Sequence, residues 1–138
     1  MYKDTVTIFN RLRRNGTDTW YPTVLHGVDL NVDSAAIRKA YGADSNDRAK
    51  LHIAYANGIV IGGKQYYLPE NWTGDGITFH DGDLFDFFWE GEWTGGNVND
   101  EDYRDGFFNY MKKNHDMVFA ITSIARYSVI PHFEIMGA

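Results

Sequence analysis

The densest group of side chains that could do chemistry lies at residues 79–93, which read FHDGDLFDFFWEGEW. Five carboxylates, one histidine, two tryptophans and four phenylalanines fall within this stretch. Paired carboxylates can act as general acid and general base, and carboxylates beside a histidine can bind a metal ion. Either chemistry requires that the acidic side chains share one face of the element that carries them.

The alternation of residue types within this stretch predicts a β-strand over residues 84–93. Successive side chains of a strand point to opposite faces, so the residues separate by parity. One face would carry Phe85, Phe87, Trp89 and Trp93, and the other would carry Leu84, Asp86, Phe88, Glu90 and Glu92. A helix would separate aromatic from acidic residues less cleanly, and Gly91 would destabilise it. We therefore expect a strand with an aromatic core face and an acidic face.

Catalysis by a carboxylate pair is not favoured by the spacing in this strand. Asp86 and Glu90 are four residues apart, about 13 Å at the strand rise, whereas paired glycosidase carboxylates lie roughly 5–9.5 Å apart. Glu90 and Glu92 come closer, but no neighbouring residue would make one of them a proton donor. We expect no catalytic residue here.

A metal site is not indicated by the sequence either. The turn His80-Asp81-Gly82-Asp83 lacks the spacing of a calcium loop, which needs further acidic ligands and a late glutamate. Asp and Gly are also the residues that tight turns use. The histidines stand singly, at positions 26, 52, 80, 115 and 132. We expect no bound metal and no cofactor.

Other catalytic and nucleotide-binding motifs are absent from the sequence. It has no cysteine, no G-x-S-x-G nucleophile elbow, no P-loop and no dinucleotide-binding fingerprint. Arg11, Arg13 and Arg14 could contact phosphate, but a basic hairpin tip is more often solvated, and an acidic chain binds nucleic acid poorly. The residues therefore predict a module that is not an enzyme.

Charge is distributed unevenly along the 138 residues. The net charge is −6, yet residues 69–105 hold eleven acidic residues and one basic residue, so the remainder sums to +4. A basic set lies near the start of the chain: Lys3, Arg11, Arg13 and Arg14. Opposed charged faces would suit stacked or head-to-tail assembly. The alternative is a chance segregation of surface charge.

No segment of the sequence is typical of a membrane span or a signal peptide. No apolar run approaches the roughly 20 residues that a spanning helix needs. The first residues, MYKDTVTIFNRLRRNG, contain no apolar h-region. We expect an intracellular product.

Residue patterns predict about seven short strands and one late helix. Strand patterns cover residues 5–12, 19–30, 49–56, 59–61, 77–79, 84–93, 118–127 and 129–136. Asn15-Gly16 and Asn57-Gly58 indicate hairpin turns. A helix is expected over about 99–113 and a short one near 34–41. The pattern favours a mainly β fold, an antiparallel barrel or sandwich, as a single domain over residues 1–138.

Four segments, taken in order, resemble a known protein family: MYKDTVTIFNR, WYPTVLHGVDL, ITFHDGDLFDFFWEGEW and VFAITSIARYSVIPHFEIMG. They resemble small proteins encoded in tailed phages and prophages of Gram-positive bacteria. These belong to the minor capsid or head-tail connector group, which includes head-closure (stopper) proteins. The resemblance spans nearly the whole chain, and it carries no catalytic motif.

The resemblance implies a small β-barrel that assembles as a homo-oligomeric ring in the virion neck, between the portal or adaptor and the tail. The protein would be made in the host cytoplasm, contact no membrane, and let double-stranded DNA pass without sequence-specific binding. An acidic face, toward the channel or a basic neighbouring ring, would consist of Asp81, Asp83, Asp86, Glu90 and Glu92. A basic face would consist of Lys3, Arg11, Arg13 and Arg14.

Two alternative functions stay open at this point. One is a different role in the same virion, as a tail terminator or a minor capsid component. The other is a carbohydrate- or ligand-binding β-sandwich whose stacking platform would be Trp72, Trp89 and Trp93.

Overall fold

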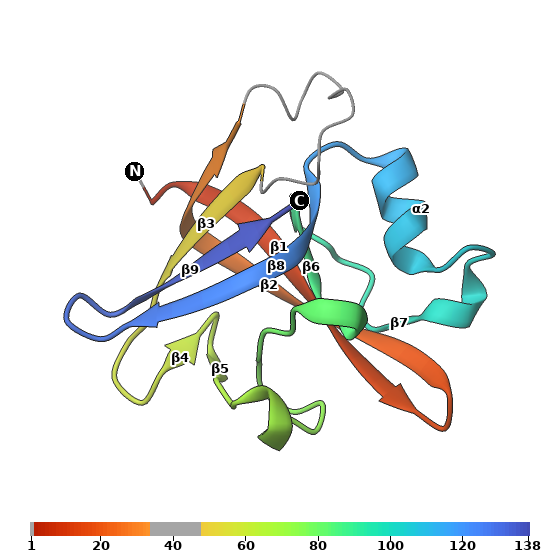
Figure 1. Ribbon diagram of the computed structural model, residues 1–138, viewed down its shortest axis with the longest axis horizontal. Coiled ribbons are helices and arrows are strands. Elements are labelled where there is room, and N and C mark those ends of the chain that lie inside the picture. The colour runs from red at the N-terminus through yellow and green to blue at the C-terminus, as the bar shows by residue number, and fades with distance from the viewer. Residues whose placement is uncertain (1, 34–47) are drawn as a thin grey trace.

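Six antiparallel strands close into a barrel within the residues that the computed structural model describes, 2–33 and 48–138 (Figure 1). Their order around the barrel is β1 (Asp4–Arg14), β6 (Phe87–Glu90), β8 (Val118–Tyr127), β9 (His132–Gly137), β3 (Ala49–Ala54) and β2 (Thr17–Val32), and β2 pairs again with β1. A short strand, β7 (Val98–Asn99), extends the sheet beyond β2. The predicted mainly β, antiparallel fold is confirmed, as a barrel.

The long strand β2 closes the barrel because it pairs with two neighbours in succession. Its residues from Thr17 to Val28 pair with β1, and Asp29–Val32 pair with β3. The register with β1 shifts where Gly27 is left over, and Gly27 has a φ of 70°. Such a bulge bends a strand and increases its twist, which lets β2 turn away from β1 and pair with β3.

The β1–β2 hairpin has the predicted turn. Asn15 and Gly16 both take positive φ, 53° and 78°, which is the backbone of a two-residue hairpin loop whose twist matches its strands. Arg14 and Thr17 are the last paired residues on either side. The predicted hairpin is confirmed, but its strands run closer to the turn than the predicted 5–12 and 19–30, because the loop has only two residues.

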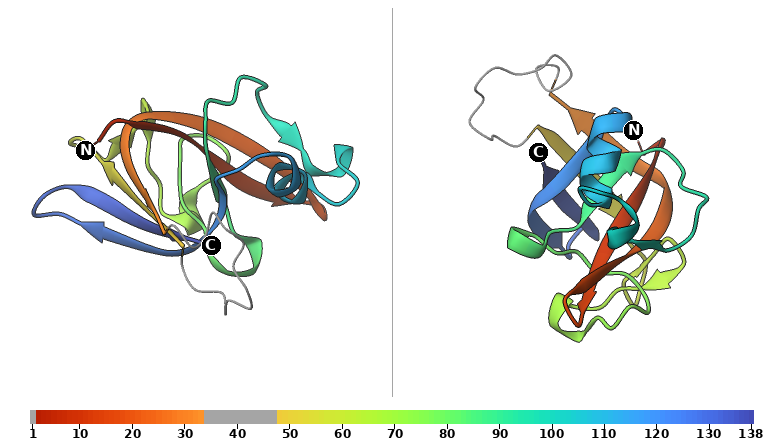
Figure 2. Two further views of the ribbon diagram at one scale, coloured as in Figure 1. Left: turned by 90° about the horizontal axis from the view of Figure 1, so that it is seen from above. Right: turned by 90° about the vertical axis from the view of Figure 1, so that its right-hand side faces the viewer.

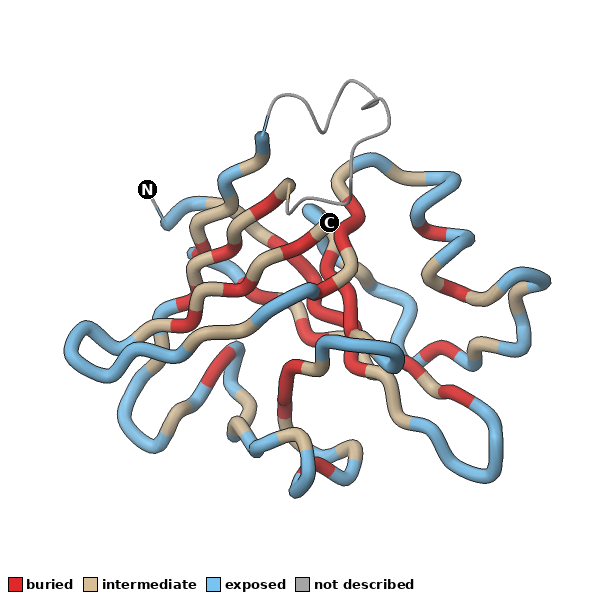
Figure 3. Tube along the Cα trace, viewed as in Figure 1, coloured by how far each residue is buried: buried red, intermediate tan, exposed pale blue. Residues whose placement is uncertain are grey.

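Two hydrophobic clusters stabilise the fold, one inside the barrel and one outside it. Inward side chains of the six strands form the first cluster, together with Ile77 and Phe79. The second lies between the outer face of β1, β2 and β6 and the helix α2 (Phe107–Asn114). Phe88 belongs to the inner cluster and Phe87 to the outer one, so β6 is buried on both faces. Buried positions concentrate along the strands, and exposed ones in the connections (Figure 3).

The strand predicted over residues 84–93 is shorter than expected. Residues Gly82–Leu84 form a 3₁₀ turn, η2, and only Phe87–Glu90 form the strand β6. The aromatic face of the prediction is confirmed, because Phe87 is buried and Phe85, Trp89 and Trp93 pack against its cluster. The opposite face is not an acidic surface, since it carries Phe88 into the barrel.

The second predicted hairpin is wrong. Residues 49–56 do not pair with 59–61 as a ladder; one bridge joins Ala56 and Val60 among the described residues. Both edges of β3 are instead occupied, by β2 and β9. The strand β4 (Val60–Ile61) pairs with β5 (Lys64–Gln65) across Gly62 and Gly63, which both have positive φ.

The late helix begins about seven residues after its predicted start. Asp100–Asp102 form a 3₁₀ turn, η3, and α2 starts only after Gly106, whose φ is 89°. The carboxylate of Asp100 accepts hydrogen bonds from the Phe107 backbone N–H and from Trp20 Nε1, both at 2.8 Å. It thereby joins the helix start to the barrel wall. The short helix expected near 34–41 lies outside the described residues.

The β8–β9 hairpin and α2 lie at opposite ends of the molecule. Figure 2 shows α2 against the outside of the barrel at one end, with the hairpin extending from the other. A further 3₁₀ turn, η1 (Pro69–Asn71), lies between β5 and the buried residues 77–79. In the part of the chain that the structure describes, no helix is long and apolar enough to cross a membrane.

Candidate functional site

An exposed apolar tip ends the β8–β9 hairpin, in the connection Ser128–Pro131 (Figure 1). The side chain of Val129 is 95% exposed and that of Ile130 is 74% exposed. Tyr127, at the end of β8, is also exposed. Burial of a valine or isoleucine side chain is worth about 1.5–3 kcal/mol, so this tip gains free energy if another surface covers it.

The base of the hairpin is held firmly by hydrogen bonds and ring contacts. The hydroxyl of Tyr55 donates to the Tyr127 carbonyl at 2.8 Å, and the Tyr55 N–H donates to the Pro131 carbonyl at 3.3 Å. His132 Nδ1 lies 2.7 Å from the Ile130 carbonyl oxygen. The rings of Tyr127 and His132 stack at 4.9 Å. The tip is therefore presented in one orientation by an ordered base.

The predicted acidic face loses Asp86, which is 0% exposed. Its carboxylate accepts hydrogen bonds from Asn10 Nδ2 and the Arg11 N–H, both at 2.7 Å. It also accepts from the His80 N–H at 2.9 Å, and His80 Nδ1 lies 3.0 Å from both of its oxygens. The assignment of Asp86 to an exposed face was wrong, because strand parity cannot tell an acidic surface from a buried, fully bonded carboxylate.

The buried carboxylate of Asp86 organises the turn that precedes β6. The Asp86 N–H donates to the His80 carbonyl while Asp86 accepts from the His80 N–H, so residues 80–86 form a closed loop fastened to β1. Burial raises the pKa of Asp86, and the hydrogen bond from His80 partly offsets that rise. Asp86 therefore holds the loop in place, because every donor to its carboxylate belongs to the loop or to β1.

The four other predicted acidic residues are exposed, but they form two pairs. Asp81 and Asp83 lie in the turn before β6, and Glu90 and Glu92 lie at its far end. The strand β6, four residues or about 13 Å long at the strand rise, lies between the two pairs. A ligand or neighbour would meet two acidic spots rather than one continuous face.

The predicted basic set is also divided. Arg13 Nε donates to Asp18 at 2.7 Å, and Arg11 Nη1 lies 3.4 Å from the same carboxylate. The Arg11 guanidinium lies over the rings of Trp20 and Phe85, at 4.5 and 4.8 Å from their centroids. The side chains of Arg11 and Arg13 are thus engaged within the chain.

The two remaining members of the basic set are exposed at opposite ends of β1. Arg14 ends the strand, where its Nη2 donates to the Thr73 carbonyl at 3.2 Å. Lys3 precedes the strand, eleven residues earlier and therefore about 35 Å away along an extended chain. The structure does not bring the four predicted basic residues together.

The tryptophans proposed as a sugar-binding platform do not lie on one open surface. Trp72 is 6% exposed and donates through Nε1 to the Gly76 carbonyl at 3.2 Å. Trp89 and Trp93 pack against the outer hydrophobic cluster. A stacking platform needs exposed ring faces, so this alternative loses the residues that suggested it.

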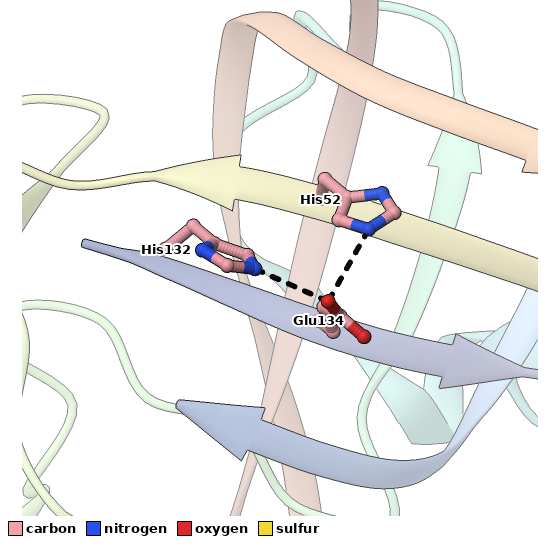
Figure 4. A group of neighbouring side chains, drawn as sticks. All are labelled: His52, His132 and Glu134. Carbon is pink, nitrogen blue, oxygen red and sulfur yellow. Dashed lines mark hydrogen bonds and ion pairs between the residues drawn. The ribbon is translucent and has the colours of Figure 1, made fainter. Parts of the chain in front are cut away.

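A group that the sequence patterns missed is formed by His52, His132 and Glu134 (Figure 4). One potential ligand atom from each residue lies within 4.8 Å of the others. The available signal was His132-Phe133-Glu134, two polar residues on one face of a strand. Its partner His52 is 80 residues away in the sequence, and only the pairing of β3 with β9 brings it near.

Comparison with known proteins identifies a family and no characterised relative. The family described as "Family of unknown function (DUF6751)" matches residues 1–138. No curated protein and no solved structure matches the chain.

Proposed function

We propose that this chain, which belongs to the family of unknown function DUF6751, is a non-enzymatic structural protein of a tailed-phage virion. In this proposal it is a head-tail connector of the head-closure (stopper-like) type. Copies form a ring that joins the portal or adaptor to the tail around the DNA channel. The sequence resemblance described above, over nearly the whole chain, is one support for the proposal.

The exposed tip of the β8–β9 hairpin is the observation that carries this proposal. A ring subunit must offer its neighbour a surface that is ordered beforehand, because ordering on contact costs free energy. Val129 and Ile130 are exposed at the end of a hairpin whose base is fixed by Tyr55 and His132. Those features suit insertion into an adjacent subunit.

The position of the hairpin favours a contact that generates rings. The tip lies at the end of the molecule opposite α2 (Figure 2). If the tip of one copy binds the far end of the next, the contact is heterologous, and heterologous contacts form rings when the rotation closes. The occupant that we assign to the surface around the tip is therefore a second copy of this chain.

Exposed carboxylates are consistent with a channel through which DNA passes. Asp81, Asp83, Glu90 and Glu92 are all exposed. Carboxylates and phosphates repel each other, so an acidic lining lets a duplex move without binding. In the proposal these four residues face the channel or a basic neighbouring ring, and Asp86 takes no part.

The test is the double variant Val129→Ser with Ile130→Ser, in a phage or prophage that encodes the chain. We expect virion necks to lack the ring and infectious particles to fall at least tenfold, because the tip no longer buries apolar surface. The matched control is Val60→Ser with Leu68→Ser, two exposed apolar residues away from the hairpin. Particle titre and electron microscopy of the necks are the measurements.

Two results would contradict the proposal. One is a tip variant that assembles as well as the control variant. The other is a purified wild-type virion that contains no copy of the chain. If the chain is found in another ring of the neck, the result would instead assign it as a tail terminator or minor capsid component.

A further inference from the structure

We infer that His52, His132 and Glu134 form a binding site for a divalent transition-metal ion, with Zn²⁺ as the best match (Figure 4). Two imidazole nitrogens and one carboxylate oxygen are a common set of protein ligands for Zn²⁺, and water can take the fourth position. The inference concerns the isolated chain and does not rest on the proposed function.

The strand register places the three side chains on one outer face of the barrel. His52 of β3 and Glu134 of β9 are directly paired. His132 is two residues before Glu134, so it lies on the same face. The residues on either side of Glu134, Phe133 and Ile135, belong to the inner cluster. The ligands therefore belong to paired strands of a closed barrel, which limits how far they can separate.

The distances between donor atoms fit a tetrahedral ion. His132 Nε2 is 3.2 Å from Glu134 Oε2, and His52 Nε2 is 3.5 Å from the same oxygen. Metal–ligand bonds of about 2.0–2.1 Å in a tetrahedron separate neighbouring ligand atoms by about 3.3 Å. Both histidine–carboxylate distances therefore already lie near the spacing that a bound ion requires, and the two histidine nitrogens, within 4.8 Å of each other, could reach it by a small side-chain shift.

The hydrogen bond to Ile130 fixes which nitrogen of His132 faces the site. The Ile130 carbonyl can only accept, so His132 Nδ1, 2.7 Å away, carries the proton of that bond. In the neutral ring, Nε2 then holds a lone pair directed at the Glu134 carboxylate. Ligating histidines commonly have their second nitrogen bonded to a carbonyl in this way.

In this neutral tautomer the Nε2 lone pair of His132 and the Glu134 carboxylate face each other at 3.2 Å, so a cation bound between them is stabilised by both. His52 Nε2 lies 3.5 Å from the same carboxylate oxygen, on its other side, so the three side chains converge on one point. A metal ion accounts for all three side chains at once.

The surroundings of His52 provide a second partner for its ring. His52 Nδ1 is buried and has no hydrogen-bond partner among the described residues. The Asp29 carboxylate, opposite His52 on β2, lies 3.9 Å from it. A small shift of either side chain would let Nδ1–H donate to Asp29 while Nε2 binds the metal, a carboxylate–histidine–metal arrangement.

Metal binding would also tie the hairpin tip to the barrel wall. His132 holds the Ile130 carbonyl through one nitrogen and would hold the ion through the other. His52, on the neighbouring strand, would bind the same ion. A bound ion would then add to the hydrogen bonds that already order the base of the tip.

Titration of the full-length, chelator-treated chain with Zn²⁺ tests the inference. We expect one ion per chain by calorimetry, a higher melting temperature with Zn²⁺ than with chelator, and the visible absorption of a tetrahedral centre with Co²⁺. Binding should weaken from about pH 7.5 to about pH 5.5, because protons compete for the imidazoles.

Single variants identify the ligands. His52→Gln and His132→Gln should each weaken Zn²⁺ binding at least tenfold, whereas His26→Gln, at an exposed histidine elsewhere on the barrel, should leave it unchanged. Circular dichroism of each metal-free variant checks that it folds. Absence of stoichiometric Zn²⁺ and Co²⁺ binding by the wild-type chain would overturn the inference. Unchanged binding by a folded variant that carries both His52→Gln and His132→Gln would overturn it as well. Neither result depends on whether rings form.

Discussion

The carboxylate of Asp86 lies among nitrogen donors in the interior, although Asp81 and Asp83, a few residues earlier, are exposed. Asn10 and Arg11 reach it from β1 and His80 from its own loop. A carboxyl group in this position is tolerated because the surrounding N–H donors are directed at it. At the scale of single residues, bonding partners rather than residue type decide whether a carboxylate belongs to the surface.

Replacing Asp86 with alanine should destabilise the fold strongly. The change leaves the Arg11 and His80 N–H groups without their acceptor, and it removes one of the two acceptors of Asn10 Nδ2, which keeps the Thr78 carbonyl. We expect a loss of about 3–5 kcal/mol in the free energy of unfolding. Urea denaturation followed by tryptophan fluorescence measures it.

The matched control for this change is Asp83→Ala, which removes an exposed carboxylate three residues away. An exposed substitution of this kind should shift stability by no more than about 0.5 kcal/mol. Equal effects of the two changes would mean that the hydrogen bonds of Asp86 contribute nothing to the fold.

The β1–β2 hairpin is stabilised beyond its turn by a cross-strand group of charges. Arg13 and Asp18 are directly paired residues, and Arg11 lies two residues along the same face. Hydrogen bonding from Arg13 lowers the pKa of Asp18, against an opposing effect of burial. Opposite charges facing each other across two strands favour this register over its alternatives.

The stability of the chain should fall in acid partly through Asp18. A pKa that is lower in the folded than in the unfolded state contributes stability above the ordinary value of 3.8. That contribution is lost as the pH falls through the lowered, folded-state pKa. Asp18→Asn should cost about 1–3 kcal/mol at neutral pH, and the difference from wild type should vanish at low pH.

Urea unfolding at a series of pH values checks this expectation, with Glu101→Gln as an exposed control. The control should keep the acid dependence of the wild type. A difference between wild type and Asp18→Asn that stays constant down to low pH would show that the charge of Asp18 does not stabilise the hairpin.

At the scale of the whole molecule, the last strand completes the barrel. Gly137 pairs with Ala49 of β3 and with Ile121 of β8, and the backbone of Ala138 exchanges two hydrogen bonds with Ala120. Phe88 and Phe119 of the inner cluster lie directly against Gly137. Closure therefore depends on a position with no side chain.

Gly137→Ala should strain the pairing of β9 with β3 and β8. A Cβ there would lie 2.8 Å from the Phe119 Cβ and 2.9 Å from the Phe88 Cζ, closer than atoms pack. We expect a loss of about 1–3 kcal/mol and faster amide exchange in β3, β8 and β9. Urea denaturation and hydrogen exchange are the measurements.

The control is Ala54→Val, which adds side-chain atoms at an exposed position of β3. It should leave exchange in the three strands unchanged. If Gly137→Ala behaved in the same way, the packing of Phe88 and Phe119 against the last strand would not be what closes the barrel.

Local chemistry determined the parts of this protein that could be predicted from sequence. Asn15-Gly16 takes positive φ at little cost in free energy, which predicts the first hairpin. Alternation of side chains located the strand at 118–127 and, to within a few residues, the strand β9 that pairs with it. Parity also assigned Phe87, with Phe85, Trp89 and Trp93 beside it, to a core. These signals act between residues that are close in the chain, so they survive without knowledge of the fold.

Only the tertiary structure decided which faces are covered and which distant residues meet. Parity divides a strand into two faces, but it cannot say that α2 covers one face of β6 while the barrel encloses the other. It also cannot say that the loop before β6 folds against β1 and buries Asp86. Nor can it pair β3 with β9, because register is set by the closure of all six strands. For that reason His52 lies close to His132 and Glu134, although no residue near them in the sequence indicates this contact.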